Sequence, residues 1–360
     1  MMNTKEMRTF ARSRILPSIE KRASGGKLDR KLWKKLADMG VLGMAIDRKY
    51  GGEGAGVVEF AECLALLAGE SLDLGLALSV LDHVMLCAYP LQVFGSQKQK
   101  KEYLPGLCRG ESIGAAAISE PDAGADPARI RTLALKEGNG YVLTGEKGPV
   151  TNAPAADVFL VVAATDPAAG KNGLTAFVAE SKDGLLVEET RLGFLATSPH
   201  GRVIFDRVRI PADRMVGEEG WGHERISRSL FLWERAVVIP SIVAFMERWH
   251  HLLISALDPA GISPDHRVML AQRKVELTAY RILAERLLEL TFGDTEGGRE
   301  RLELLLFFGK ALPSWVDSMR DLVEEARVPL DETGARMLAD LRLLEVGRSI
   351  LDWQFQKVLF

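Results

Sequence analysis

The ten residues from Ala117 to Asp126 read AISEPDAGAD, and the hydropathy pattern of the chain differs on either side of them. Before this stretch, apolar residues recur at helical spacing, as in the stripe that includes Trp33, Leu36 and Met39. After it, short runs of β-forming residues are separated by Gly, Asp and Pro. The stretch therefore lies near the boundary between a helical block and a β-rich block.

The β-rich block consists of short runs at close spacing with no long helical pattern between them. These runs cover residues 141–143, 158–163, 174–178, 185–188 and 203–210. Strands without intervening helices are typical of antiparallel sandwiches and barrels. The pattern therefore predicts such a domain and argues against a Rossmann sheet.

Long amphipathic patterns return after Trp221. They cover residues 225–257, 268–290, 301–326 and 335–359. Four segments of this length predict an antiparallel helical bundle. The expected fold is α+β and multidomain, with an N-terminal helical domain over residues 1–111, a middle antiparallel β-sandwich or barrel domain over residues 112–218, and a C-terminal four-helix bundle over residues 219–360.

The composition excludes several classes of function. Of the 360 residues, 47% are hydrophobic and 26% are charged, as in globular proteins, and the formal net charge is -3. Such a charge creates no basic field, so nucleic acid is not an expected partner. The first residues lack the apolar core of a signal peptide, and no window approaches the roughly 18 apolar residues of a membrane span. We therefore expect no membrane association.

The cysteines and histidines argue for a reducing compartment and against a metal site. Cys63, Cys87 and Cys108 form no C-x-x-C pair and lie among apolar neighbours, which is typical of buried thiols in a cytoplasmic protein. His250 and His251 are adjacent, so on a helix they would point about 100° apart and could not share a metal ion. We expect a cytoplasmic protein without a metal.

The stretch AISEPDAGAD resembles the segment of acyl-CoA dehydrogenases that is usually written T-E-P-x-A-G-S-D. Other segments of that family occur in the expected order, namely FG at 94–95, YLP at 103–105, GYVL at 140–143, GEK at 145–147, VTN at 150–152 and FDRVRIP at 205–211. The ordered matches run from Leu32 to about Arg235. On these motifs the chain is identified as a divergent member of the family.

The resemblance implies an FAD-dependent enzyme that dehydrogenates the Cα–Cβ bond of an acyl-CoA thioester. In that family a carboxylate removes the α-proton, and the β-hydrogen leaves as a hydride to the flavin. The electrons then pass to an electron-transferring flavoprotein, as part of fatty acid metabolism. Family members pack as tetramers through the C-terminal bundle, so the resemblance also implies a homotetramer.

The resemblance assigns residues of this chain to the flavin and the substrate. The hydroxyls of Ser119 and Thr151 are expected to bond the edge of the flavin ring. The implied cofactor positions are Ala117, Ile118, Ser119, Gly124, Ala125, Pro149, Val150 and Thr151. The implied substrate positions are Ala125 and Arg235. Taken without the other motifs, either hydroxyl could instead cap a turn or satisfy a strand end.

Several positions depart from the family pattern and predict weaker flavin binding. Pro149 stands where the family has a Trp that packs on the flavin, and Ala125 stands where it has a serine hydroxyl. Residues 258–263 (DPAGIS) lack the Arg of the family's R-x-x-F-G turn, and residues 326–331 (ARVPLD) replace its G-G-x-G-Y segment. Val346 occupies the commonest position of the base, and valine cannot accept a proton.

Glu234 is the candidate base. In isovaleryl- and long-chain-type members the base precedes an Arg on the first bundle helix, and Glu234-Arg235 occupies that point. The apolar run 230–239 surrounds the pair, so desolvation should raise the pKa of Glu234 while Arg235 opposes the rise. The alternative is that Glu234 forms an ordinary structural ion pair. Glu345 is less suited, because on a helix it faces about 100° away from the position of Val346.

Three functions are compatible with these residues. The first is an active acyl-CoA dehydrogenase with Glu234 as base. The second is a catalytically degenerate subunit that pairs with a complete paralogue in a hetero-oligomer, because the missing groups are largely those that one subunit donates to its neighbour's flavin. The third is another flavin reaction, such as monooxygenation, for which the sequence gives no argument. Dehydrogenation is favoured because both hydroxyls are present.

Overall fold

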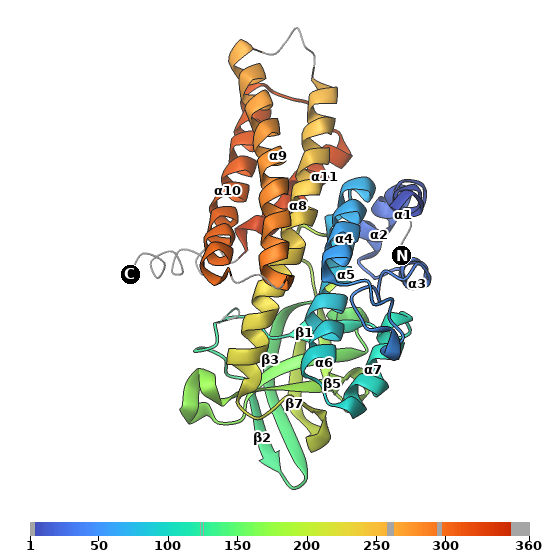
Figure 1. The fold of residues 1–360 in the computed structure, drawn as a ribbon, viewed down its shortest axis with the longest axis vertical. Helices are drawn as coiled ribbons and strands as arrows, with labels where there is room; N and C mark the ends of the chain where they lie inside the picture. The colour runs from blue at the N-terminus through green and yellow to red at the C-terminus, as the bar shows by residue number, and fades with distance from the viewer. Residues whose placement is uncertain (1–3, 123, 125, 258–262, 294–296, 347–360) are drawn as a thin grey trace.

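The computed structural model describes residues 4–122, 124, 126–257, 263–293 and 297–346. Helices come first along the chain, strands follow and helices return, so the predicted fold class is confirmed. In Figure 1 the strands gather at one end of the molecule, the last helices form an upright bundle at the other, and the N-terminal helices lie beside both. The long helix α8 (Arg228–Ala256) runs from the sheet into the bundle.

The N-terminal helices place a fully buried helical stretch at the centre of the molecule. Their bounds are α1 Thr4–Phe10, η1 Ala11–Ile15, η2 Leu16–Ser18, α2 Ile19–Gly25, α3 Arg30–Asp38, η3 Arg48–Tyr50, α4 Val57–Ser71, α5 Leu74–Leu81, η4 Asp82–Ala88, α6 Tyr89–Phe94 and α7 Gln97–Cys108. Every residue of α5 and of the π-helical turn η4 is buried. The reason is that η4 packs against β1 and α8, while α5 packs against α4 and α8.

Within the described residues, eight strands form one hydrogen-bonded sheet. Their bounds are β1 Gly114–Ala117, β2 Leu133–Glu137, β3 Gly140–Thr151, β4 Val158–Ala164, β5 Leu174–Glu180, β6 Leu186–Thr190, β7 His200–Pro211 and β8 Met215–Val216, with short helical turns η5 Ala153–Ala155, η6 Pro167–Gly173, η7 Ser181–Asp183 and η8 Ala212–Arg214. The order is β6-β7-β3-β2-β4-β5-β8, and β1 pairs with β4. Most pairs are antiparallel, but β1 and β2 run parallel to β4. These pairings join strands that are not consecutive, so the spacing of the runs could not reveal them.

Strand β4 lies between two cores, which explains its uninterrupted apolar sequence. All of its residues are buried. Phe159 and Val161 belong to an inner core that also contains Phe177, whereas the alternate residue Leu160 belongs to the core formed with the helices. Successive side chains of a strand point to opposite faces, so a strand that is covered on both faces must be apolar throughout.

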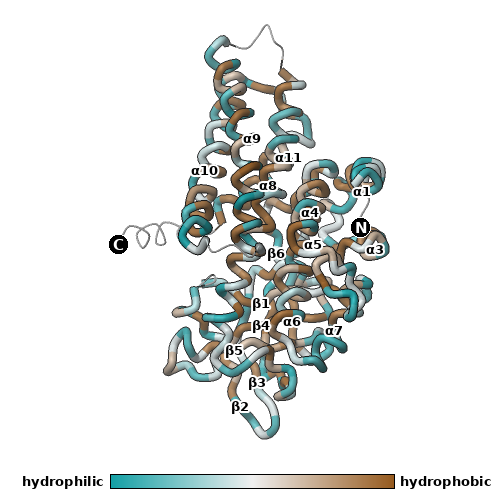
Figure 2. The backbone as a smooth tube through the Cα atoms, viewed as in Figure 1, coloured by the Kyte–Doolittle hydropathy of each residue, from teal (hydrophilic) through white to brown (hydrophobic). Residues whose placement is uncertain are grey.

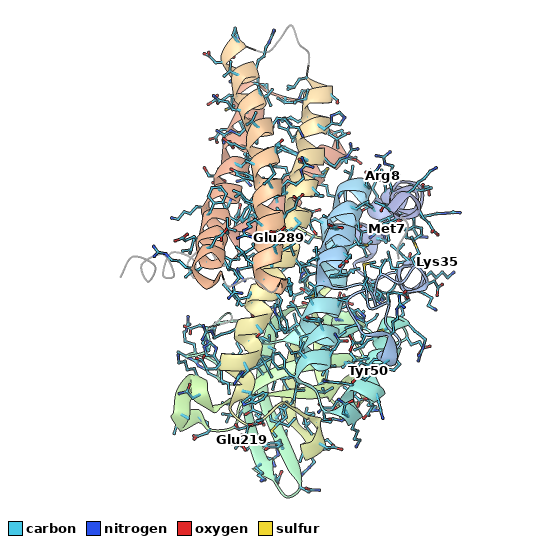
Figure 3. All side chains as sticks on the ribbon, in the orientation of Figure 1. Met7, Arg8, Lys35, Tyr50, Glu219 and Glu289 are labelled. Atoms are coloured by element: carbon cyan, nitrogen blue, oxygen red, sulfur yellow. The ribbon has the colours of Figure 1, made fainter. Side chains whose placement is uncertain are left out.

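The C-terminal helices form the bundle that the amphipathic patterns predict. Their bounds are η9 Gly222–Ser227, α8 Arg228–Ala256, α9 Pro264–Phe292, α10 Gly298–Glu325, α11 Glu332–Asp340 and η10 Leu341–Glu345. Trp249, Phe308 and Trp315 are buried between them. Figure 2 shows that α8 is hydrophobic along its middle, where it runs between α9 and the N-terminal helices. Figure 3 draws the described side chains on the same ribbon.

The last helix is shorter than predicted. The pattern over residues 335–359 predicts one long helix, but α11 ends at Asp340 and the 3-10 turn η10 follows. The Asp340 carboxylate accepts a hydrogen bond from Leu195 N at 2.6 Å, which fastens the end of α11 to the loop before β7. Residues 347–360 lie outside the described part of the chain.

Two helical stretches are long and apolar enough to cross a membrane by length and composition alone. They are Leu74–Phe94 and Gly222–Ala256. The most apolar window of the first is 94% buried inside the molecule, and that of the second is 50% buried. Packing inside the protein therefore accounts for the composition of the first stretch.

Candidate active site

Ser119 and Thr151 lie on neighbouring segments of the middle domain. Ser119 follows the end of β1, and its carbonyl oxygen accepts a hydrogen bond from Gly148 N of β3 at 2.9 Å. Thr151 is the last residue of β3. Both side chains are partly exposed, and no hydrogen bond joins either hydroxyl to another described residue. Two unpaired hydroxyls on adjacent segments fit the polar edge of a flavin ring.

The other predicted cofactor positions on these segments differ in exposure. Ala117 and Val150 are buried in the inner core of the sheet, and Ile118 packs partly buried against the helical core. Pro149 is exposed. The hydrogen bond between Ser119 and the residue before Pro149 brings the two predicted segments together. The exposed ring of Pro149 offers less apolar surface than the Trp that the family places there.

Gly124 closes a tight loop after the Ser-Glu-Pro sequence. Its φ of 56° lies in the left-handed region that favours glycine. Its N–H donates to the Glu120 carbonyl oxygen at 2.8 Å, and its own carbonyl accepts from Glu120 N at 2.9 Å. Ala125, which the resemblance assigns to both flavin and substrate, lies outside the described residues.

A buried ion pair supports the segment that carries Ser119, and the sequence analysis gave it no role. Lys147 of β3 is fully buried, and its Nζ donates to Glu120 Oε1 at 2.9 Å and to the Ile118 carbonyl at 3.0 Å. Glu120 also accepts from Thr132 Oγ1 at 2.6 Å and from two backbone N–H groups. Burial lowers the pKa of Lys147 to about 8. Burial opposes a low pKa at Glu120, but Lys147 and Thr132 together lower the pKa of Glu120 below its usual value. The signal that could have revealed this pair is a lysine among the inward-facing residues of a strand.

Glu234 lies in the first half of α8, close to the N-terminal helices. The preceding residue, Trp233, packs edge-on against Tyr89 with ring centroids 4.9 Å apart and stacks on Phe94 at 5.9 Å. Burial raises the pKa of Glu234, and Arg235 opposes that rise. The Glu234 side chain nevertheless keeps 37% of its surface accessible. The carboxyl group is therefore crowded by protein and still open to a small molecule.

Arg235 pairs only loosely with Glu234. The distance from Arg235 Nη1 to Glu234 Oε2 is 3.7 Å, which is too long for a hydrogen bond. The guanidinium carbon of Arg235 lies 3.6 Å from the centroid of the Phe231 ring, within the range of a cation–π contact. Because the arginine is held on the ring, the carboxylate oxygens remain available. This geometry disfavours an ordinary structural ion pair.

Asp82 is a second acid near Glu234 that the sequence analysis missed. It is the first residue of η4, it is 6% exposed, and its Oδ1 accepts a hydrogen bond from Ala116 N at 3.2 Å. Burial, and then the charge of Glu234, raise the pKa of Asp82 well above its usual range. Burial thus raises the pKa of both acids, and the charge of Glu234 adds to the rise at Asp82. The sequence did not reveal Asp82 as a candidate residue, because it lies in an apolar helical run that is typical of a protein core.

The other carboxylate considered from the sequence, Glu345, is exposed and paired. It lies 3.5 Å from Arg320 and 3.7 Å from Arg342. Val346, at the family's commonest base position, is 64% exposed. Residues 258–262, in the segment that lacks the expected Arg, and residues 347–349, which follow Val346, lie outside the described part of the chain.

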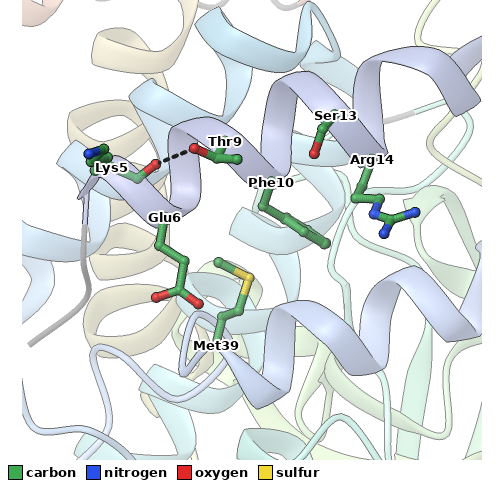
Figure 4. A pocket seen from close by; sticks show the side chains of 7 residues that line it. All are labelled: Lys5, Glu6, Thr9, Phe10, Ser13, Arg14 and Met39. Atoms are coloured by element: carbon green, nitrogen blue, oxygen red, sulfur yellow. Dashed lines mark hydrogen bonds between the residues drawn. The ribbon is translucent and has the colours of Figure 1, made fainter.

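Glu234 lines neither of two hollows in the surface of the described residues. One, of about 500 Å³, is lined by Lys5, Glu6, Thr9, Phe10, Ser13, Arg14 and Met39. Figure 4 shows Phe10 and Met39 facing each other across it. The second, of about 440 Å³, adjoins the Glu120–Lys147 pair and is lined by Glu120, Pro121, Asp122, Arg129, Arg131, Thr132, Gly145, Glu146 and Arg202.

The described residues contain no group of three His, Cys, Asp or Glu side chains that could hold a metal ion. His250 is buried, and its Nε2 lies 3.0 Å from the Leu270 carbonyl oxygen. Cys63 and Cys87 are buried and form no disulfide, and burial raises the pKa of each thiol to about 12. These groups therefore belong to the core.

Comparison with protein families matches most of the chain. Residues 1–111 match the N-terminal domain of acyl-CoA dehydrogenases, and residues 115–208 match their middle domain. An L-prolyl-[peptidyl-carrier protein] dehydrogenase of Pseudomonas fluorescens is 32% identical over 302 residues, which cover 80% of this chain and 78% of that protein. An acyl-CoA dehydrogenase of Bacillus subtilis is 34% identical over 225 residues, but the match covers only 62% of this chain and 59% of that protein.

Solved structures extend the likeness to the C-terminal bundle. The structure described as PigA with FAD and proline has a TM-score of 0.88 and 26% identity, and the match covers 99% of this chain and 95% of that one. A glutaryl-coenzyme A dehydrogenase in complex with glutaryl-CoA has a TM-score of 0.85 and 26% identity, with 99% and 94% covered. The bundle therefore keeps its fold where its sequence departs most from the motifs.

Proposed function

Because the chain belongs to the acyl-CoA dehydrogenase family, we propose that it oxidises the Cα–Cβ bond of an acyl thioester with Glu234 as the base. The family consists of flavin oxidoreductases that act on CH–CH bonds with FAD. The observation that carries the proposal is the state of Glu234, which is crowded enough for burial to raise its pKa and only loosely paired with Arg235. A general base needs this combination of proton affinity and free oxygens.

In the proposed reaction the Cα–H and Cβ–H bonds break and a carbon–carbon double bond forms. The Glu234 carboxylate accepts the α-proton. Bound FAD would supply the acceptor for the hydride that leaves Cβ. Ser119 and Thr151 would donate to the ring edge, and Arg235 would lie beside the substrate while its position on Phe231 keeps it from capturing the base.

The carrier, the electron acceptor and the assembly are further parts of the proposal. Relatives of this chain are named for CoA thioesters and for a thioester on a peptidyl carrier protein, and we propose acyl-CoA as the substrate. The usual properties of acyl-CoA dehydrogenases support three further proposals. They are electron transfer to an electron-transferring flavoprotein, a role in cytoplasmic fatty acid metabolism, and assembly as a homotetramer or as a hetero-oligomer with a paralogous subunit.

A catalytically degenerate subunit is the second candidate function. It is favoured by the exposed Pro149 in place of an aromatic ring and by the exposed Val346 at the commonest base position. In that case the chain would contribute only part of a shared flavin or acyl pocket. Protein expressed alone would then be colourless and would gain flavin only with its partner.

The proposal predicts yellow protein that reduces a dye when an acyl thioester is added. Glu234→Gln keeps the shape of the side chain and removes the base, so kcat should fall by about 10²- to 10⁴-fold. Absorption spectra report bound flavin, and dye reduction reports turnover. Glu224→Gln, which removes an exposed acid just before α8, serves as the matched control and should retain its rate. Full turnover by the Glu234→Gln variant would eliminate Glu234 as the base.

A further inference from the structure

Asp82 is buried and has no basic partner among the described residues, in contrast to Asp73 in the same domain. Asp73 Oδ2 lies 2.5 Å from Arg22 Nη2, and Asp73 Oδ1 accepts from Thr197 Oγ1 at 2.5 Å. Asp82 is 6% exposed, and Ala116 N is the one donor to it among the residues that the structure describes. Its Oδ2 atom thus has no donor from those residues. Removing a carboxylate from water without a counter-charge is costly, so this arrangement requires an explanation.

The position of Asp82 connects it with the proposed reaction. Turn η4 packs against both β1 and α8. The donor Ala116 belongs to β1, and the segment that follows β1 carries Ser119. From α8, Glu234 is close enough for its charge to act on Asp82. Asp82 therefore lies where the proposed base and the segment assigned to the flavin edge come together.

Most of the elements that pack against η4 place no charged side chain beside Asp82. Helix α5 and strands β1 and β4, which pack against η4, carry no ionisable side chains. Helix α6 carries Tyr89, whose pKa is raised by burial and by Asp47. The lysines of α7 reach solvent, and Lys98 among them pairs with Asp213 at 2.5 Å. No cation from these helices and strands offsets the acid.

Among the remaining neighbours of Asp82, the nearby charged side chain is that of a second acid, Glu234. Glu234 on α8 is negative when ionised, and Arg235 is held over Phe231. On η4 itself, His83 is neutral because burial lowers its pKa to about 4, and its ring is bonded to two backbone groups. Burial also raises the pKa of Cys87 to about 12, so that thiol is uncharged. None of the described residues therefore offers Asp82 a positive charge, whereas a bound ligand can.

We propose that the substrate supplies this charge and that Asp82 binds a protonated amine on the α-carbon of the acyl group. The inference rests on the proposed function, in which Glu234 removes the α-proton. With the α-carbon at Glu234, the part of the substrate that reaches the nearby Asp82 is a substituent close to that carbon. A hydrogen bond between an ammonium and a carboxylate is stronger than one between neutral groups, and Oδ2 is available for it. The substrate class is therefore α-aminoacyl thioesters.

Recognition of an amine by Asp82 should also change the number of protons bound to the protein, and this change can be measured. In the empty site, burial and the charge of Glu234 both favour the protonated form of Asp82. When the ammonium binds, its charge lowers the pKa of Asp82, and the Asp82 proton leaves to solvent. The Glu234 carboxylate can still accept the α-proton. Binding of an α-amino ligand should therefore release about one proton, whereas binding of a neutral ligand should not.

The first test compares two substrates of nearly equal shape on the FAD-loaded protein. The thioesters of pantetheine with 2-aminobutyrate and with 2-methylbutyrate differ in a single group, an ammonium against a methyl. At pH 6.5 the α-amino group is largely protonated. The wild-type protein should favour the amino compound in kcat/KM by at least about tenfold, and Asp82→Asn, which keeps an oxygen for Ala116 N, should bring the ratio to about one. A wild-type preference for the methyl compound would overturn the proposal.

Asp73→Asn is the matched control, because Asp73 is an equally buried acid with partners of its own. This variant should lose stability and should change kcat/KM for both thioesters by the same factor. A change of preference in the Asp73→Asn variant similar to that in Asp82→Asn would show a general loss of packing and would contradict the assignment to Asp82.

The second test measures binding without turnover. The amide analogue of 2-aminobutyryl-pantetheine is titrated calorimetrically into the FAD-loaded protein in phosphate and in imidazole buffers, whose heats of ionisation differ. The wild-type protein should release about one proton per ligand and Asp82→Asn about none. Binding without proton release would refute the role of Asp82. If neither thioester reduces the flavin but the proton is released, the proposed dehydrogenation fails and the recognition by Asp82 stands.

Discussion

Two glutamates of this protein each have a basic neighbour, and the geometry of the two pairs is opposite. Glu120 and Lys147 lie 2.9 Å apart, the lysine is fully buried, and three further donors reach Glu120. Glu234 and Arg235 lie 3.7 Å apart, and the arginine is turned onto the Phe231 ring.

The difference shows how a glutamate can form a supporting ion pair in one place and keep the properties of the proposed base in another. Donors and a close cation stabilise the charged form, so the pKa of Glu120 is lowered in spite of burial and its oxygens are occupied. At Glu234 burial prevails over a more distant cation, so the pKa is raised and the oxygens stay free. The distance to the cation therefore distinguishes the supporting carboxylate of Glu120 from the proposed base, Glu234.

The largest effect, on the free energy of unfolding, is expected from breaking the close ion pair between Glu120 and Lys147. Lys147→Met keeps the length of the side chain but leaves Glu120 buried without its cation, which should reduce the free energy of unfolding by about 3–5 kcal/mol. Urea denaturation followed by circular dichroism measures this loss. Arg202→Met is the matched control, because Arg202 pairs with Glu146 at the surface, and its loss should cost less than about 1 kcal/mol. Equal effects of the two substitutions would contradict a structural role for Lys147.

The order of helical and β-rich blocks could be predicted because it depends on local periodicity. The apolar run 158–163 is visible in the sequence, yet its parallel partners β1 and β2 depend on contacts between distant segments. The candidate site residues fall into the same two groups: some can be found in local sequence motifs, and others depend on contacts between distant segments. Ser119 and Glu234 were found through motifs, whereas Asp82 belongs to an apolar helix, and its relation to Glu234 arises only when η4 packs on α8.

A smaller effect is expected at Asp340, whose cation is also distant. It accepts from Leu195 N at 2.6 Å, while Arg336 lies 3.4 Å away, and burial raises the pKa of Asp340 to about 6. A carboxyl group with a raised folded-state pKa stabilises the fold fully below its unfolded value near 3.8, and this contribution is lost as the pH rises through about 6. Asp340→Asn is neutral at every pH. Its stability relative to wild type should therefore rise by about 1–3 kcal/mol between pH 4 and pH 7 in urea titrations, and a difference that does not change with pH would contradict this.

The smallest effect, on the pH dependence of kcat/KM, is expected from replacing Arg235, the cation that pairs only loosely with Glu234. Arg235→Met keeps an apolar contact with Phe231 and takes away the charge that lowers the pKa of Glu234. The acidic limb of the pH profile of kcat/KM, which reports the base in the free enzyme, should then move to higher pH by up to about one unit. Arg228→Met is the control on the same helix, because Arg228 pairs with Glu224 at 2.7 Å and should leave the profile in place. A limb that stays fixed in the Arg235→Met variant would mean that the arginine exerts no charge effect on the base, and a limb that moves to lower pH would mean that a group other than Glu234 accepts the proton.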